Sequence, residues 1–190
     1  SFGDRIAATI DTDISRLFID LDRARTSLRP DQDGVIKKST RFGKPVFKEG
    51  HFPDEIAIAN MLQRYWMPFH DAAKKIISTG SVRLVLDCHT MMAVGPKVSR
   101  DPGKPRPLVM IEHRVRERDA VRETCAAGLA GALMEQMEKS FSGEECTIAE
   151  KFLVSDAPSS GYVIQSLRKH TIPVMRISLS QSLFLNDSHF

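Results

Sequence analysis

The chain has 190 residues, of which 42% are hydrophobic and 27% are charged, and its net charge is +3. This length suits one domain with a substantial core. The small, scattered charge argues against a nucleic-acid partner. The longest apolar run, CAAGLAGALM, is about half the length of a membrane span. Three cysteines without CxxC spacing (Cys88, Cys125 and Cys146) and no visible signal peptide favour the cytoplasm over an oxidising compartment.

The first half of the chain predicts one strand, one long loop and two helical stretches. Residues 14–21 are predicted as a strand with Asp22 and Arg23 at its end, and the polar, Gly- and Pro-rich residues 25–53 as a loop. Asp54 is expected to cap a helix with an apolar stripe. Pro68 is expected to end or kink that helix, because proline lacks an amide donor. A second apolar stripe follows and stops at Gly80.

The second half predicts strands that alternate with helices. Residues 82–92, 108–113, 146–155 and 172–179 are predicted as strands, and residues 95–107 as a loop. Asp119 is expected to cap a long helix whose inward residues include Val121, Cys125 and Leu129, and residues 159–170 are expected to form a short helix. This order predicts a single α/β domain over residues 1–190, with a mixed, mostly parallel central sheet flanked by helices.

Two of the predicted strands end in polar clusters, and ligands of such folds bind beyond the carboxyl ends of the strands. Asp87, Cys88 and His89 lie on one strand, where Cys88 points to the opposite face and is expected to pack in the core. His89 is a candidate metal ligand, general base or purely structural histidine, and Asp87 either orients an imidazole or caps the following turn. Arg23 either holds a substrate carboxylate or forms a salt bridge with a neighbouring acid.

Five segments resemble motifs of the N-formylglutamate amidohydrolase family, in the same order and over nearly the whole chain. SRLFIDLDR is similar to that family's S-R-x-x-x-D-L-N-R, and RYWMPFH to its R-Y-x-x-P-[YF]-H. LVLDCHTM is similar to L-x-D-C-H-S-M, the most specific motif of the set. SDAPSSGYVI resembles N-x-P-Y-x-G-G-x-I-T, and ISLSQSLFLND, which ends at Asp187, resembles the closing E-x-x-x-x-L-Y-x-x-E.

The resemblance implies a fold similar to that of the zinc carboxypeptidases and the metal-assisted hydrolysis of a small N-formyl or other N-acyl amino acid. The cofactor would be zinc or another divalent metal. The resemblance makes His89 a metal ligand and Arg23, Asp22 and Arg16 the substrate-binding group. Asp87 and His70 would hold these residues in place without contacting the metal or the substrate themselves. It also implies a small-molecule partner and a place in histidine degradation, whereas the absence of nucleic-acid and membrane partners is expected from the composition.

The chain departs from the family pattern at three places. The histidine-containing segment expected well before residue 15 has no match, so the remaining metal ligands are expected upstream of Ser1. Asp22 replaces an asparagine, and its charge would repel a substrate carboxylate unless it is paired or protonated. Ser178 occupies the position of the catalytic glutamate, and losing a general base typically costs about a hundred- to ten-thousand-fold in rate. Glu112 and Asp156 are open alternatives for the base, and a non-catalytic ligand-binding relative is the alternative function.

Overall fold

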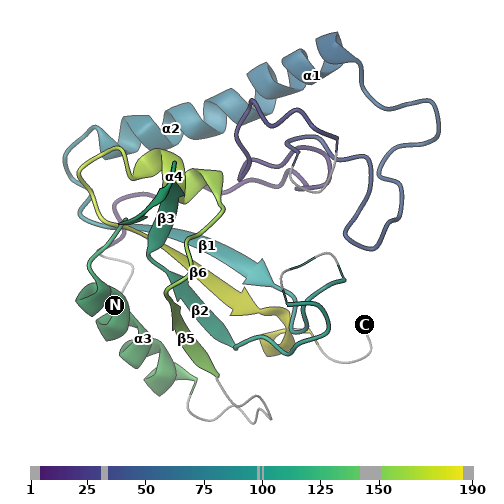
Figure 1. Ribbon diagram of the computed structural model, residues 1–190. Helices are drawn as coiled ribbons and strands as arrows, with labels where there is room; N and C mark the ends of the chain where they lie inside the picture. Colours follow the sequence, from purple (N-terminus) through teal and green to yellow (C-terminus); the bar gives the residue numbers. More distant parts are fainter. Residues whose placement is uncertain (1–4, 31–33, 98, 100, 142–150, 186–190) are drawn as a thin grey trace. The chain divides into compact units, whose positions relative to one another are not determined.

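The computed structural model describes residues 5–30, 34–97, 99, 101–141 and 151–185. Cys146 and Asp187, which the sequence analysis names, lie outside these ranges. The chain divides into two compact units (Figure 1). One unit consists of Ser1–Arg83 and Gly161–Ile172, and the other of Leu84–Ser160 and Pro173–Phe190. No helix among the described residues is long and apolar enough to cross a membrane.

The second unit is built on a four-stranded sheet with the order β1-β6-β2-β5. Strands β1 and β6 pair in parallel, as do β2 and β5, whereas β6 and β2 are antiparallel. The α/β class and the mixed, mostly parallel sheet predicted from the sequence are therefore confirmed. The strand bounds are β1 Val85–Met91, β2 Val109–Glu112, β5 Phe152–Ser155 and β6 Val174–Ser180, after which a short 3₁₀ turn, η3, covers Gln181–Leu183.

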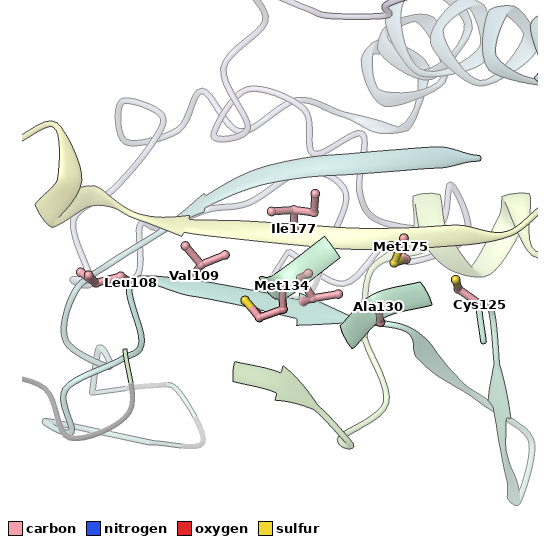
Figure 2. Packing of buried hydrophobic residues seen from close by; sticks show 8 residues of the cluster. Leu108, Val109, Cys125, Ala130, Met134, Met175 and Ile177 are labelled. Atoms are coloured by element: carbon pink, nitrogen blue, oxygen red, sulfur yellow. The ribbon is translucent and has the colours of Figure 1, made fainter. Parts of the chain in front are cut away.

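One face of this sheet is apolar and packs against helix α3, Ala127–Ser140. Side chains alternate between the two faces of a strand, and the register places Val109, Met175 and Ile177 together on this face. Ala130 and Met134 are the buried residues of α3, and they join the same cluster (Figure 2). A hydrophobic face covered by a helix is the usual way to bury a sheet, so this cluster is the core of the unit.

The segment around Asp119 is a β-hairpin, so the prediction that Asp119 caps a helix is wrong. Strands β3, Arg114–Glu117, and β4, Ala120–Glu123, pair antiparallel around a two-residue turn. Arg118 has a φ of 53° there, which matches the positive φ that tight hairpin turns require. Buried Val115 favours the strand, since β-branched side chains fit a pleated sheet. The helix starts only at Ala127.

Cys88 is exposed, so the prediction that it packs in the core is also wrong. It points away from Asp87 and His89, as the alternation predicts, and therefore lies on the face that α3 covers. However, α3 contacts β2 and β5, whereas β1 is an edge strand of the sheet. The edge position leaves Leu86, Cys88 and Thr90 exposed.

The first unit contains the expected helices. Asp54 Oδ1 accepts a hydrogen bond from Ala57 N at 2.8 Å and caps α1, Glu55–Met61. The helical stretch then passes through a π-helical turn, η2, Leu62–Trp66, into α2, Met67–Ile77, with Pro68 in its first turn. The π turn accommodates Pro68, because Met67 N bonds Leu62 O five residues back. The short helix predicted within residues 159–170 is α4, Tyr162–Leu167.

Residues 14–21 form turns instead of the predicted strand. Phe18 N and Ile19 N both donate to Ser15 O, at 2.9 and 3.1 Å. The apolar pattern that suggested a strand belongs to a local turn, and the acidic residue of this segment, Asp20, is held by ion pairs. Of the backbone N–H groups in this segment, that of Asp20 donates to a distant carbonyl, Val35 O. The loop predicted over residues 25–53 is confirmed where it is described, and it carries one isolated bridge, between Ser39 and Pro45.

Candidate active site

The face of the sheet opposite α3 carries polar side chains at its centre. Register partners in adjacent strands share a face, and β1 and β6 pair Asp87 with Arg176 and His89 with Ser178. On β2, Glu112 is the partner of Arg176 and Met110 the partner of Ser178. The sheet thus places an acid, a histidine, an arginine and a serine side by side, and three of these four belong to the sequence-predicted set.

Asp87 and His89 form a hydrogen-bonded pair. His89 Nε2 lies 2.8 Å from Asp87 Oδ1. Burial by itself would raise the pKa of Asp87, but the His89 hydrogen bond and the Arg176 charge outweigh it and hold that pKa below its usual value. Because Asp87 is ionised, its Oδ1 accepts the hydrogen bond, and His89 Nε2 therefore carries the proton. A neutral His89 therefore keeps its lone pair on Nδ1, the state in which a histidine binds a metal.

Ser178, the position for which the sequence motif predicts a glutamate, is buried. Its row across the sheet consists of His89, Met110 and, on β5, Leu153. No carboxylate belongs to this row among the described strands. A serine hydroxyl beside a histidine does not replace a carboxylate as general base.

In the other unit, Arg16, Asp20 and Asp22 form a compact charged cluster. Arg16 Nε and Nη2 donate to the two oxygens of Asp20 at 3.1 and 3.2 Å, and Arg16 Nη2 lies 3.6 Å from Asp22 Oδ2. Asp22 Oδ1 also accepts a hydrogen bond from Val163 N at 3.2 Å. The negative charge of Asp22 is therefore paired.

Lys37 completes this cluster, and the sequence analysis missed it. Lys37 is buried, with 8% relative exposure, and its ammonium group donates to Asp20 Oδ2. Burial alone would raise the pKa of Asp20, but the Arg16 and Lys37 charges lower it. Burial lowers the pKa of Lys37, and Asp20 opposes that shift. Lys37 lies in the long loop that no motif covers, so no spacing signal pointed to it.

His70 and Trp66 support the backbone of the same motif. His70 Nε2 lies 2.9 Å from Leu21 O, and Trp66 Nε1 donates to Arg23 O at 2.8 Å. The two rings stack with a centroid distance of 3.9 Å. Burial lowers the pKa of His70, which favours a neutral ring that donates to the carbonyl. His70 and Trp66 together thus hold the main chain on the two sides of Asp22.

Arg176 is the second residue that the sequence analysis missed. Its Nε and Nη2 donate to Asp87 Oδ2 at 3.0 and 2.7 Å. A signal was available, because positions 176, 178 and 180 are polar and alternate with apolar residues along β6. Of the two alternative bases, Glu112 lies on the polar face beside Arg176, whereas Asp156 forms a 2.7 Å ion pair with Arg114.

Fold and side chains define an α/β protein whose sheet carries an ionised acid–histidine pair on its polar face. Residues 2–185 match the sequence model of the family described as N-formylglutamate amidohydrolase, and the chain belongs to that family. No curated protein matches the chain.

One solved structure is similar in fold, the crystal structure of a gene product from Agrobacterium tumefaciens. It is 18% identical to the chain with a TM-score of 0.55, and the match covers 91% of this chain and 60% of that one. The chain thus spans less than two thirds of its structural neighbour. At this identity the likeness shows the fold.

Proposed function

We propose that the protein is a metal-dependent amidohydrolase that cleaves a small N-formyl or other N-acyl amino acid. The observation that carries the proposal is the family match over residues 2–185. The products would be formate, or another small acid, and a free amino acid, which suits a cytoplasmic enzyme of histidine degradation. The same match supports the assignment of residues 1–190 to one domain.

The donor set of β1 fits a divalent metal. His89 keeps an unprotonated Nδ1, because Nε2 is bonded to ionised Asp87, and metal-binding histidines typically bond a carboxylate in this way. His89 would hold the metal, and Asp87 would orient the His89 ring. A bound zinc ion would supply Lewis acidity for hydrolysis of the amide.

The charged cluster of the other unit suits the recognition of a carboxylate. Arg23 is the proposed binding group, since a guanidinium offers a planar fork of donors that matches a carboxylate. Its backbone is fixed through the 2.8 Å bond from Trp66. The pairing of Asp22 with Arg16 removes the repulsion that an unpaired acid would cause. The Nε and Nη2 groups of Arg16 contact Asp20, and Nη2 also lies near Asp22. The role of Arg16 is therefore to hold this cluster in place.

The absence of a carboxylate at position 178 favours a second candidate, a relative that binds N-acyl amino acids without hydrolysing them. The two candidates predict different effects on formate release when a carboxylate is introduced at position 178. In an enzyme that lacks only the base, Ser178→Glu raises the rate of formate release by about a hundredfold or more. Ser178→Gln, of matched size and without charge, leaves the rate unchanged.

The experiment measures formate release from a panel of N-formyl amino acids, with zinc content determined by elemental analysis. Ser178→Glu is compared with Ser178→Gln and with the unchanged protein, each with and without a chelator. A chelator-sensitive gain in Ser178→Glu alone supports the hydrolase. Binding of the same compounds by calorimetry, with no formate from any variant, would establish the binding protein instead.

A further inference from the structure

Arg176 is a buried arginine that no motif identified and that contacts the acid behind the candidate metal ligand. Its relative exposure is 8%. Asp87 and Arg176 are direct register partners on β1 and β6, so the backbone of the sheet sets their separation. Both Nε and Nη2 donate to one carboxylate oxygen, Asp87 Oδ2.

This contact divides the two oxygens of Asp87 between two partners. Oδ1 accepts the bond from His89 Nε2, and Oδ2 accepts both bonds from Arg176. A carboxylate held on one side only can rotate and exchange its oxygens, and an imidazole bonded to it can then turn or change tautomer. Two charge-assisted bonds to Oδ2 oppose that rotation.

We propose that Arg176 is a positioning residue: by fixing the Asp87 carboxylate it keeps the proton of His89 on Nε2 and the Nδ1 lone pair open to a divalent cation. The metal part of this inference rests on the proposed function, whereas the effect on the His89 tautomer does not. The alternative is that Arg176 only neutralises a buried acid. In that case its removal lowers stability and leaves the His89 tautomer unchanged.

The test uses the full chain, labelled with ¹⁵N-histidine and free of metal, at a pH where imidazole is neutral. Long-range ¹H–¹⁵N spectra report which nitrogen of His89 carries the proton, and His89→Ala assigns the signal. We expect protonated Nε2 to dominate in the unchanged protein and a mixture of tautomers in Arg176→Gln. Arg176→Lys, which keeps the charge but offers a single donor group, is expected to fall between them. If Arg176→Gln does not fold, Arg176→Lys alone tests whether the His89 tautomer changes.

Arg114→Gln is the matched control, because Arg114 also forms an ion pair in this unit, with Asp156. It should leave the His89 spectrum unchanged. Zinc titration of the same proteins should show Arg176→Gln binding zinc about 10- to 100-fold more weakly, as removing a group that holds a metal ligand in place typically does.

An unchanged His89 tautomer in both Arg176 variants would overturn the positioning role. A changed tautomer in a protein that binds no zinc would support the positioning role and contradict the proposed metal dependence. The two readouts therefore separate a failure of this inference from a failure of the proposed function.

Discussion

Replacing Lys37 by methionine should destabilise the protein, although methionine is apolar and of similar size. Lys37 is buried and donates to Asp20, which is 1% exposed. The substitution removes one of the two cations that compensate a buried carboxylate. Methionine fills most of the space of the lysine stem, so the lost charge, and not a cavity, dominates the result.

The structure sets the expected magnitude. Removing one partner of a buried ion pair typically costs about 3–5 kcal/mol. Asp20 keeps Arg16, whose Nε and Nη2 contact both of its oxygens, so the carboxylate stays partly compensated. We therefore expect a loss at or just below the lower end of that range, about 2–3 kcal/mol. In a double-mutant cycle with Asp20→Asn, the coupling energy should be about 1–3 kcal/mol.

Urea unfolding of the four proteins in the cycle measures these free energies. Lys38→Met is the matched control, because Lys38 is adjacent in sequence and exposed. The Lys38 ammonium lies 5.0 Å from the centre of the Phe52 ring, and an exposed cation–π contact contributes about 0.5–1 kcal/mol, so the stability of Lys38→Met should fall by about 1 kcal/mol or less. Equal losses in Lys37→Met and Lys38→Met, or a coupling energy near zero, would refute the role assigned to the Lys37–Asp20 pair.

Three further changes test other parts of the structure. The pKa of Asp20 in the folded protein is below its usual 3.8, so the unfolded state takes up the proton first as the pH falls. The stability advantage of the unchanged protein over Asp20→Asn should therefore be constant above about pH 5 and shrink below it. An advantage that does not depend on pH would contradict this. Arg118→Gly should raise the free energy of unfolding by about 0.5 kcal/mol, since glycine adopts the positive φ of 53° without strain; thermal unfolding checks this, and a lower midpoint would count against it. Asp54→Ala should cost about 1 kcal/mol, because Ala57 N loses its capping acceptor, whereas Asp54→Ser should cost much less.

The sequence predicted the parts of the fold in which side-chain periodicity and local chemistry agree. The strand carrying Asp87 and His89 is apolar enough to be recognised, and its alternation placed the two residues on one face. Asp54 was recognisable as a helix cap because capping depends on residues within one turn. Such features need no knowledge of distant partners.

The errors arose where distant contacts or ion pairs decide the structure. Residues 14–21 have the apolar content of a strand, yet Asp20 is held by Lys37, seventeen positions away, and the segment forms turns. Cys88 follows the correct alternation, but its exposure depends on the edge position of β1, which only the sheet order sets. Arg176 meets Asp87 through the pairing of β1 with β6, so its role appears only in three dimensions.

The two substitutions within the family motifs differ in whether the structure compensates for them. Lys37 helps to neutralise Asp20, which leaves Arg16 able to pair with Asp22 as well, so the aspartate adds no unpaired charge. Ser178 has no acid in its own row, which on the described sheet contains His89, Met110 and Leu153, whereas Asp87 and Glu112 lie in the next row of the same face, on either side of Arg176. These contacts favour the proposal that the protein recognises a carboxylate and lacks the general base at position 178. A single restored carboxylate at position 178 is therefore the change that separates a slow hydrolase from a binding protein.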